Sequence, residues 1–483
     1  MELERLVAAL APEAVLGSPD PVEVRDLAYD TRAVSPGAAF FCVPGERADG
    51  HDFAGEAVEN GAVVLVVERA VEPQVPQLVV PSARAAMATV ADVFFGEPTR
   101  ELEVAGVTGT SGKTTTAYLL YSVLEAAGRS PGLLGTVESR VGEEVRPVIR
   151  TTPEAIDLQR TFREMLDAGN RSVALEASSH ASVLHRLDRV RFDALVFTNL
   201  SQDHLDFHES MEDYFAAKRK LFTGAAPPPA AVNIGDTWGR RLADELEQTR
   251  RAPLLTFGLA EDAEIRPERL ELGATGARFT AGGIEIRTSL RGRFNVENAL
   301  GTIAAGILLD VDEDEIASGI AALEGVPGRF EAVDEGQPFS VVVDYSHKPD
   351  ALDNVLRTAR DLAKGRVIVV FGAGGDRDRQ KRPLMGRVAR DLADIVIVTS
   401  DNPRSEDPLM IIQDVLQGTG TDVEIDADRR SAIGRAVELA EPGDVVVIAG
   451  KGHEQGQEIG GEKLPFDDRL VAREALGLQR RGS

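Results

Sequence analysis

Short apolar runs alternate with stretches of helical spacing along the whole chain. Strand-like runs include 62-AVVLVV-67, 103-EVAGVTG-109 and 172-SVALE-176, while helical spacing marks 82–95 and 296–309. This alternation is typical of α/β units built on parallel sheets. No apolar run approaches the roughly 18 residues of a membrane helix, and the acidic opening MELERLVAAL does not resemble a secretory signal. We therefore expect a soluble, cytoplasmic α/β protein without a membrane partner.

The order of these elements predicts three domains. The chain has 483 residues, and at roughly 150 residues per domain this length suggests about three. Turn-rich segments at 96–101 and 324–331 divide the chain. The expected domains are residues 1–99, 100–328 and 329–483.

In the third block, four apolar runs each end in a polar cluster. They are 341-VVVDYSH-347, 367-VIVVFGAGGDRD-378, 395-IVIVTSDNPR-404 and 445-VVVIAGKGHE-454. Helical stretches between them predict a parallel sheet. Ligands of open parallel sheets bind beyond the carboxyl ends of the strands. We therefore expect the four clusters to converge on one edge and form a site, although four unrelated turns are the alternative.

Composition excludes some classes of function. The chain has 79 acidic and 53 basic residues, a formal net charge of −26. A duplex-binding protein normally shows a basic footprint, so nucleic acid is not an expected partner. Small anionic ligands remain compatible, because they need only a local nest of N–H groups and a few cations. The single cysteine, Cys42, excludes a disulfide framework and a multi-cysteine zinc site.

The segment 109-GTSGKTT-115 lies between a predicted strand and a predicted helix. Its glycines would let backbone N–H groups approach phosphate oxygens at the helix N-terminus. Lys113 would reach the outer phosphates, and the Thr114 hydroxyl would bind Mg²⁺. Val107 stands where the strict phosphate-loop pattern has its first glycine. Nucleotide binding is therefore predicted from the strand–loop–helix context, with an ordinary glycine-rich turn as the alternative.

Two further strands end in polar residues that we expect near this loop. Glu176 and His204 are the best-placed metal ligands, since Mg²⁺ favours carboxylates and accepts an occasional histidine. The i, i+4 spacing of His204 and His208 leaves zinc on a helix as an alternative, but a structural role is favoured for His208. Lys218, in the helical stretch 214–222, would normally be a surface lysine.

Taken together, the motifs resemble those of the Mur ligases of peptidoglycan synthesis. Ten occur in order between about residues 26 and 470: GTSGKTT, EASSH, TNLSQDHLDFH, YFAAK, NVENA, GRFE, DYSHKPD, GAGGDRD, DNPR and GKGHE. The resemblance implies a UDP-binding N-terminal α/β domain, a central P-loop-type ATPase domain and a C-terminal Rossmann-like domain. It also implies an ATP-dependent amide ligase that extends the D-Glu of UDP-N-acetylmuramoyl-L-alanyl-D-glutamate through an acyl phosphate.

The resemblance further implies roles for individual positions. ATP would contact Gly109, Thr110, Ser111, Gly112, Lys113, Thr114, Thr115, Asn298, Arg329, Asp344 and His347. The UDP-linked substrate would contact Thr31, Glu46, Arg47, Ala48, Thr151, Thr152, Ser178 and Arg186. The catalytic residues would be Lys113, His204 and a Lys218 carbamylated by CO₂, and two Mg²⁺ ions would use Thr114, Glu176, His204 and Lys218. The sequence departs from the family pattern at Leu184, Glu46 and Arg47. These departures leave details of the contact with the UDP-linked substrate open.

The added amino acid is suggested by 401-DNPR-404, which is similar to the version in enzymes that add meso-2,6-diaminopimelate. Arg404 would take the second carboxylate of that substrate in two parallel hydrogen bonds, and lysine lacks this group. The expected amino-acid site comprises Arg377, Asp401, Asn402, Pro403, Arg404, Gly450 and Glu454. The alternatives are L-lysine as substrate, a folylpolyglutamate- or cyanophycin-type ligase, and a nucleotide-dependent switch that hydrolyses ATP without ligation. We expect the protein to be a monomer.

Overall fold

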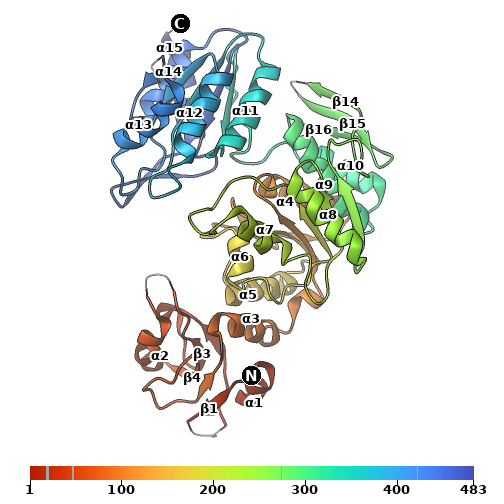
Figure 1. Ribbon diagram of the computed structural model, residues 1–483, viewed down its shortest axis with the longest axis vertical. Helices are drawn as coiled ribbons and strands as arrows, with labels where there is room; N and C mark the ends of the chain where they lie inside the picture. The colour runs from red at the N-terminus through yellow and green to blue at the C-terminus, as the bar shows by residue number, and fades with distance from the viewer. Residues whose placement is uncertain (18–20, 46–47, 274, 421, 483) are drawn as a thin grey trace.

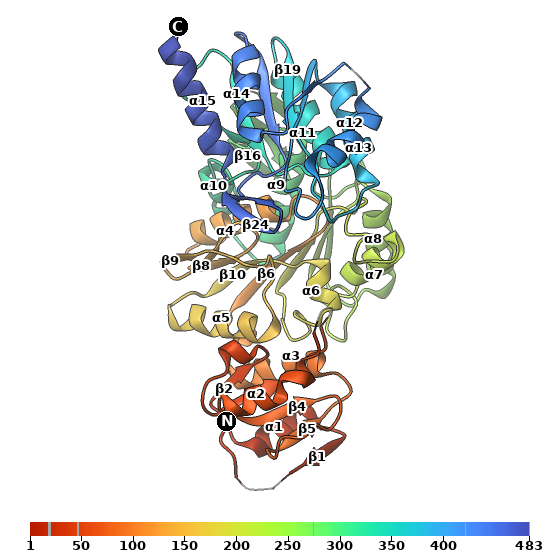
Figure 2. The same ribbon diagram turned by 90° about the vertical axis from the view of Figure 1, so that its left-hand side faces the viewer.

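Three sheet-centred units lie one above another along the long axis of the molecule (Figure 1 and Figure 2). The structure is a computed structural model that describes residues 1–17, 21–45, 48–273, 275–420 and 422–482. The first unit lies at one end, the second in the middle, and the third, which carries the C-terminus, at the other end.

The first unit is a five-stranded sheet in the order β1-β5-β4-β3-β2. Strands β2 to β5 run parallel, whereas β1 pairs antiparallel with β5. Almost every residue of β3 and β4 is buried, as expected of parallel strands covered on both faces. The strands are Ala14–Leu16 (β1), Asp26–Ala28 (β2), Ala38–Phe41 (β3), Ala62–Val67 (β4) and Gln77–Val79 (β5). The helices are Leu3–Leu10 (α1), Ala54–Glu59 (α2) and Ala83–Phe94 (α3), with 3₁₀ turns at Thr31–Ala33 (η1), Gly50–Phe53 (η2) and Pro98–Arg100 (η3).

The second unit contains an eight-stranded sheet in the order β13-β12-β11-β6-β10-β7-β8-β9. The six strands from β13 to β7 run parallel, and β8 and β9 continue as an antiparallel edge. Its strands are Glu103–Thr108 (β6), Pro131–Leu134 (β7), Ser139–Val141 (β8), Glu144–Arg146 (β9), Ser172–Glu176 (β10), Ala194–Phe197 (β11), Ala230–Asn233 (β12) and Leu254–Phe257 (β13). A separate antiparallel sheet is formed by Glu268–Gly273 (β14), Gly276–Ala281 (β15) and Ile284–Thr288 (β16).

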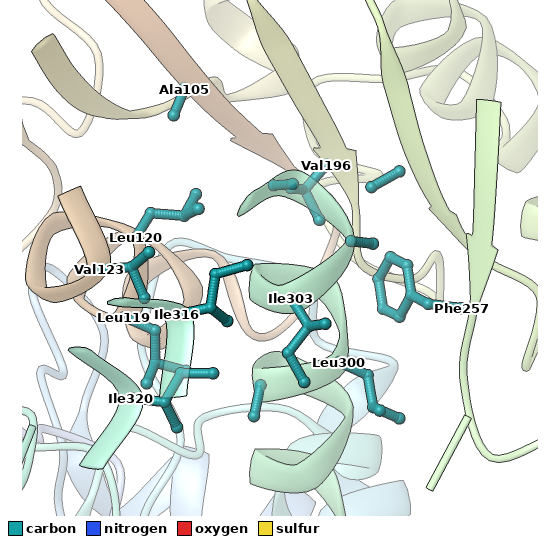
Figure 3. Packing of buried hydrophobic residues seen from close by; sticks show 14 of the residues in the cluster. Ala105, Leu119, Leu120, Val123, Val196, Phe257, Leu300, Ile303, Ile316 and Ile320 are labelled. Carbon is teal, nitrogen blue, oxygen red and sulfur yellow. The ribbon is translucent and has the colours of Figure 1, made fainter. Parts of the chain in front are cut away.

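Seven helices of the described second unit surround these strands. They are Lys113–Ala126 (α4), Ala155–Asp167 (α5), Ser179–Val183 (α6), Met211–Arg219 (α7), Thr237–Thr249 (α8), Arg293–Leu308 (α9) and Glu313–Ala322 (α10). Figure 3 shows the core that α4, α9 and α10 form against the sheet, with Leu120, Val123, Ile303, Ile316 and Ile320 in contact. Burying each such side chain contributes roughly 1.5–3 kcal/mol. This packing holds the start of α4 against the end of β6, where the glycine loop lies.

The third unit is a six-stranded sheet in the order β17-β18-β22-β19-β20-β21. All four predicted runs are neighbouring parallel strands, so the predicted parallel sheet is confirmed. The strands are Glu331–Ala332 (β17), Ser340–Asp344 (β18), Val367–Phe371 (β19), Ile395–Val398 (β20), Glu424–Ile425 (β21) and Val445–Ala449 (β22), followed by a hairpin of Gly456–Ile459 (β23) and Glu462–Pro465 (β24). The helices are Pro349–Leu362 (α11), Lys381–Leu392 (α12), Pro408–Thr419 (α13), Arg429–Leu439 (α14) and Asp468–Gly482 (α15).

The first and second units are joined through α3 and α5, which lie side by side (Figure 1 and Figure 2). The Tyr29 hydroxyl donates to Asp157 Oδ2 at 2.6 Å, and Arg160 reaches Asp26 at 3.0 Å. These polar contacts connect the first unit to helix α5 of the second unit. None of the helices in the described ranges is long and apolar enough to span a membrane.

A fully buried ion pair fixes the C-terminal helix to the third sheet. The Arg429 guanidinium donates to both oxygens of Asp468 at 2.7 Å, and both side chains are 0% exposed. The same guanidinium donates to the carbonyl oxygens of Ser400 at 3.3 Å and Ala449 at 3.0 Å. These two residues come directly before the polar clusters that follow β20 and β22. The pair therefore supports the strand ends from behind.

Replacement of Asp468 by alanine leaves the Arg429 guanidinium charged and unpaired inside the protein. We expect Asp468→Ala to lower the free energy of unfolding of the third unit by about 3–5 kcal/mol. The matched control is Glu474→Ala, since Glu474 lies on the same helix as Asp468 and forms an exposed ion pair with Arg430. Its loss should change the free energy of unfolding by about 1 kcal/mol or less. Guanidinium unfolding followed by circular dichroism measures both. Equal midpoints for the two variants would contradict a structural role for the buried pair.

Candidate active site

The glycine loop between β6 and α4 is held in one conformation by its neighbours. The backbone N–H of Thr110 donates to Asn199 O, and that of Ser111 donates to Asn199 Oδ1, both at 2.9 Å. Gly112 has a φ of 89°, and a Cβ there would lie 2.3 Å from Asn298 Oδ1. Both the left-handed backbone and the close packing therefore require glycine at this position.

Lysine side chains converge on the carbonyl oxygens of the same loop. Lys113 Nζ donates to Gly109 O at 2.9 Å and to Thr110 O at 3.0 Å. Lys218 Nζ donates to Gly109 O at 2.8 Å. Burial, together with the nearby charge of Lys348, lowers the pKa of Lys113 to about 8. Lysine side chains thus surround the loop, and Lys113 in particular suits a phosphate group.

Lys218 is not the surface lysine that its helical segment predicts. It is 1% exposed, whereas Lys220, two residues later, has a side chain that is 48% exposed and pairs with Asp188. Burial first, and then the charges of Lys113 and Lys348, lower the pKa of Lys218 well below its ordinary value. Its amine is therefore much more readily neutral, and more nucleophilic, than that of a solvated lysine.

Glu176, at the end of β10, points its carboxylate at the start of α4. It is 1% exposed and accepts hydrogen bonds from the Thr114 hydroxyl at 3.1 Å and the Thr136 backbone N–H at 2.8 Å. Hydroxyl and carboxylate oxygens are the ligands that Mg²⁺ prefers. In the described part of the chain, no three His, Cys, Asp or Glu side chains gather as a metal centre. A divalent ion bound here would therefore take further oxygens from water and a ligand, as Mg²⁺ commonly does.

Histidines from two segments line the same cavity as Glu176: His180 lies in the short helix α6, and His204 lies in the turns that follow β11. His204 has a φ of 55°, and its ring centroid lies 4.8 Å from that of His180. Residues 204–208 form turns rather than a helix, so the alternative of zinc on a helix was wrong. His208 Nε2 instead lies 3.0 Å from Ser179 Oγ, the structural role favoured by the sequence. Burial lowers the pKa of His204 to about 3, which keeps its imidazole neutral and able to bind a metal.

The polar clusters of the third unit meet at one sheet edge, as predicted. The amide of Asn402 donates to Glu454 Oε2 at 2.9 Å. Lys451 Nζ, which the sequence analysis did not single out, donates to Asn402 Oδ1 at 2.8 Å and to Glu454 Oε2 at 2.9 Å. The Arg404 guanidinium donates to Gly375 O at 2.5 Å. The buried Lys451 thereby fixes two side chains expected to bind the amino acid.

Two cavities meet between the second and third units. The loop cavity, of about 670 Å³, surrounds the glycine loop, and the strand-end cavity, of about 310 Å³, lies at the carboxyl edge of the third sheet. The two cavities share part of their lining. The shared residues are His180, Asp203, His204, Tyr345, His347, Lys348 and Arg377. A molecule in one cavity would therefore lie next to a molecule in the other.

Most of the predicted site residues line these cavities. The loop cavity includes Thr110, Ser111, Gly112, Lys113, Thr114, Thr115, Thr151, Thr152, Glu176, Ser178, Arg186, His204, Lys218, Asn298, Arg329, Asp344 and His347. The strand-end cavity includes Arg377, Asp401, Asn402, Arg404, Gly450 and Glu454. Neither cavity is lined by Gly109, Pro403, Thr31 or Ala48. Thr31 and Ala48 belong to the first unit, and Glu46 and Arg47 lie outside the described residues.

Among the residues that the structure describes, two ion pairs connect the third unit to the second. Lys348 Nζ lies 2.8 Å from Asp203 Oδ2, and Arg377 lies 3.2 Å from Asp206. Burial alone would raise the pKa of Asp203, but Lys348 and neighbouring histidines hold it well below its ordinary value. Lys348 is not among the site residues predicted from the sequence, although its place directly after a strand-end cluster and before Pro349 is a usable signal.

The fold defines a three-unit α/β protein with a P-loop-type central unit. Three family models match the chain: "Mur ligase family, catalytic domain" over residues 23–95, "Mur ligase middle domain" over 107–306, and "Mur ligase, glutamate ligase domain" over 328–452. The chain belongs to the Mur ligase family, which confirms the resemblance drawn from its motifs.

Full-length relatives agree with this assignment. The UDP-N-acetylmuramoyl-L-alanyl-D-glutamate--2,6-diaminopimelate ligase of Geobacillus thermodenitrificans is 46% identical, with 96% of each chain covered. That of Aquifex aeolicus is 45% identical, with 94% of each chain covered. A solved structure of a ligase of the same name superposes with a TM-score of 0.68 at 32% identity, covering 95% of each chain.

Gly112→Ala should disable the glycine loop, because the new Cβ would collide with Asn298 and the backbone conformation disfavours alanine. We expect its affinity for ATP, measured by calorimetry, to fall at least tenfold. Gly96→Ala is the matched control: Gly96 also has a positive φ, of 80°, but a Cβ there meets no atom within 4 Å. Unchanged ATP affinity in Gly112→Ala would show that the nucleotide binds elsewhere.

Proposed function

We propose that this chain is the ligase that joins meso-2,6-diaminopimelate to the D-Glu of UDP-N-acetylmuramoyl-L-alanyl-D-glutamate, using ATP. The observation that carries the proposal is the meeting of the loop cavity and the strand-end cavity at Asp203, His204, His347 and Lys348. A carboxylate phosphorylated at the loop would lie beside an amine held at the strand ends. The names of the relatives support this choice of substrates. We place the reaction in the cytoplasm, where ATP and UDP-linked sugars are made. We also propose that the protein acts as a monomer, because one chain supplies every side chain that this proposal uses.

In this proposal the loop binds the triphosphate. The backbone N–H groups of 109–115 and the N-terminus of α4 face its oxygens, and Lys113 turns from the loop carbonyls to the outer phosphates. Asn298, Arg329, Asp344 and His347 would line the nucleoside side. The three units would then correspond to a UDP-binding domain, an ATP-binding domain and an amino-acid-binding domain.

Thr114 and Glu176 fit a Mg²⁺ ion, since their oxygens lie 3.1 Å apart and face the loop cavity. When bound, such ions neutralise phosphate charge and orient the γ-phosphoryl group. His204 and Lys218 are the residues proposed for a second ion.

Lys218 fits carbamylation for a physical reason. Only a neutral amine attacks CO₂, and burial among cations favours the neutral form of Lys218. The new N–C bond produces a carbamate, and one proton leaves the nitrogen. The product is an anion among Lys113 and Lys348, so modification replaces repulsion with attraction.

The reaction has two balanced steps. An oxygen of the D-Glu γ-carboxylate attacks the γ-phosphorus of ATP, the bond to the bridging β-γ oxygen breaks, and ADP leaves. The neutral amine of the amino acid then attacks the acyl carbon, the C–O bond to phosphate breaks, and the amine loses a proton. Lys113 and the loop N–H groups would stabilise the negative charge that develops.

Arginines in the strand-end cavity would select the amino acid. Arg404 already has its guanidinium fixed by Gly375 O and lies 3.4 Å from Glu458, so it is oriented before the substrate binds. Arg377 would take the other carboxylate and exchange its bond to Asp206. Glu454 and Asp401 would accept the ammonium, with Lys451 and Asn402 holding Glu454 in place.

The muramoyl dipeptide would lie between the first and second units. Thr152 Oγ1 donates to the backbone oxygen of Glu176 at 2.7 Å, and Arg186 pairs with Glu154 at 2.7 Å. Both side chains are therefore fixed in the wall of the loop cavity. Thr151 and Ser178 complete this part of the proposed site. The UDP end would reach Thr31 and Ala48 on the first unit, with Glu46 and Arg47 beside them in the sequence.

The test offers the purified protein meso-diaminopimelate and L-lysine side by side, with the UDP-muramoyl dipeptide and ATP. We expect the mass of the diaminopimelate product and a preference over lysine of at least 100-fold in kcat/KM, because an unpaired Arg404 disfavours lysine. Arg404→Met should lose about 100-fold toward diaminopimelate, while Arg379→Met, which changes an exposed arginine of the same unit, should not. Equal use of lysine would overturn the specificity, and ATP hydrolysis independent of any amine would favour a nucleotide switch.

Lys218→Ala should lower kcat at least 100-fold, because the proposed carbamate is lost, and added acetate should restore part of the rate. Lys220→Ala is the control two residues away and should retain activity. Carbon-13 NMR with ¹³CO₂ should show a carbamate signal in the parent protein that Lys218→Ala lacks. A normal rate for Lys218→Ala would contradict the role of the modified lysine.

A further inference from the structure

We infer that Lys348 is a further catalytic residue: the third unit places its ammonium at the phosphate loop of the second, where it contacts the phosphoryl group in transfer. The inference rests on the proposed function. It adds a cation supplied by one unit to a nucleotide site built by another.

The backbone aims Lys348 away from its own sheet. It is the residue before α11, with φ of −146° and ψ of 158°, and Pro349 occupies the first helical position. Proline at this position fixes the start of the helix and restricts the preceding residue to extended conformations. The side chain, 8% exposed, thus leaves the third unit directly after β18 and enters the second.

Two of the three ammonium donors of Lys348 have partners in the second unit. Nζ lies 2.8 Å from Asp203 Oδ2 and 3.3 Å from Thr110 O in the glycine loop. An ammonium has three N–H donors, and Lys348 lines both the loop cavity and the strand-end cavity. The third donor is therefore available to a group located where the cavities meet, which is where the acyl phosphate would form.

The charge around the loop supports the same assignment. Lys113, Lys218 and Lys348 all donate to the carbonyl oxygens of Gly109 and Thr110. With Lys218 neutral or carbamylated, Lys113 and Lys348 are the two buried cations at this loop. They repel one another, and a polyphosphate would neutralise them. Asp203 balances Lys348 while leaving its ammonium at the loop.

The position also links catalysis to contact between the units. A cation supplied by a separate domain stabilises phosphoryl transfer only when that domain is docked, and such groups can raise kcat by about 10³ or more. Lys348 would therefore reach the phosphoryl group only when the third unit is docked on the second through its ion pair with Asp203. This would limit ATP use when the third unit is displaced.

The experiment compares Lys348→Met, Lys348→Arg and Lys364→Met, the last an exposed lysine of the same unit. We expect kcat for the ligation to fall at least 100-fold in Lys348→Met, to recover at least tenfold in Lys348→Arg, and to stay unchanged in Lys364→Met. Affinity for ATP should fall about tenfold in Lys348→Met, whereas affinity for ADP, which lacks the terminal phosphate, should change less than twofold.

If Lys348 only held the second and third units together, the result would differ. ATP and ADP affinities would then fall together, or kcat would stay within threefold, and either outcome would overturn the inference. Inactivity of Lys348→Arg equal to that of Lys348→Met would also overturn it. Failure of the proposed function is distinguishable, since the parent protein would then make no diaminopimelate product while the ATP and ADP affinities still test Lys348.

Discussion

The convergence of three lysine side chains on two neighbouring carbonyl oxygens is the interaction on which the site depends. Lys113 comes from the helix after the loop, Lys218 from α7 and Lys348 from the third unit. Residues at or just after the ends of β6, β11 and β18 line the same cavity, and α4, α9 and α10 pack together behind the loop. Positive charge without water to screen it acts strongly on a bound phosphate. The electrostatics of the site therefore depend on the core packing that holds the loop and its lysines in place.

Most of the framework was predictable from the sequence. Alternating short strands and helices gave the α/β class, and the four polar clusters of the third block lie at the ends of neighbouring parallel strands. Parallel strands place their carboxyl ends at the same edge of a sheet. Motifs that follow successive strands in the sequence could therefore be expected to lie side by side in the structure. The family membership suggested by the ten motifs is confirmed by the matched models and relatives.

Side-chain environments were harder to predict, because they depend on contacts between distant segments. Lys218 and Lys220 are two residues apart on similar helical sequence, yet only Lys218 is buried. Lys451 lies in the same motif as Glu454, but only Glu454 was predicted as a site residue. The bonds of Lys451 to Asn402 and Glu454 depend on the pairing of β22 with its neighbouring strands. The spacing of His204 and His208 suggested a helix, but the chain forms turns there because the segment wraps around His180 and Ser179.

The bond between Arg429 and Asp468 has a consequence for the order in which the molecule is assembled. Asp468 opens the last helix, and its partner guanidinium also supports the carbonyl groups that precede Asp401 and Gly450. Without this helix, the chain would have an unpaired cation beneath the strand-end cavity. The strand-end cavity therefore gains its full support only when the helix that carries Asp468 is packed, whereas the glycine loop is supported by α4, α9 and α10, which all precede that helix in the chain.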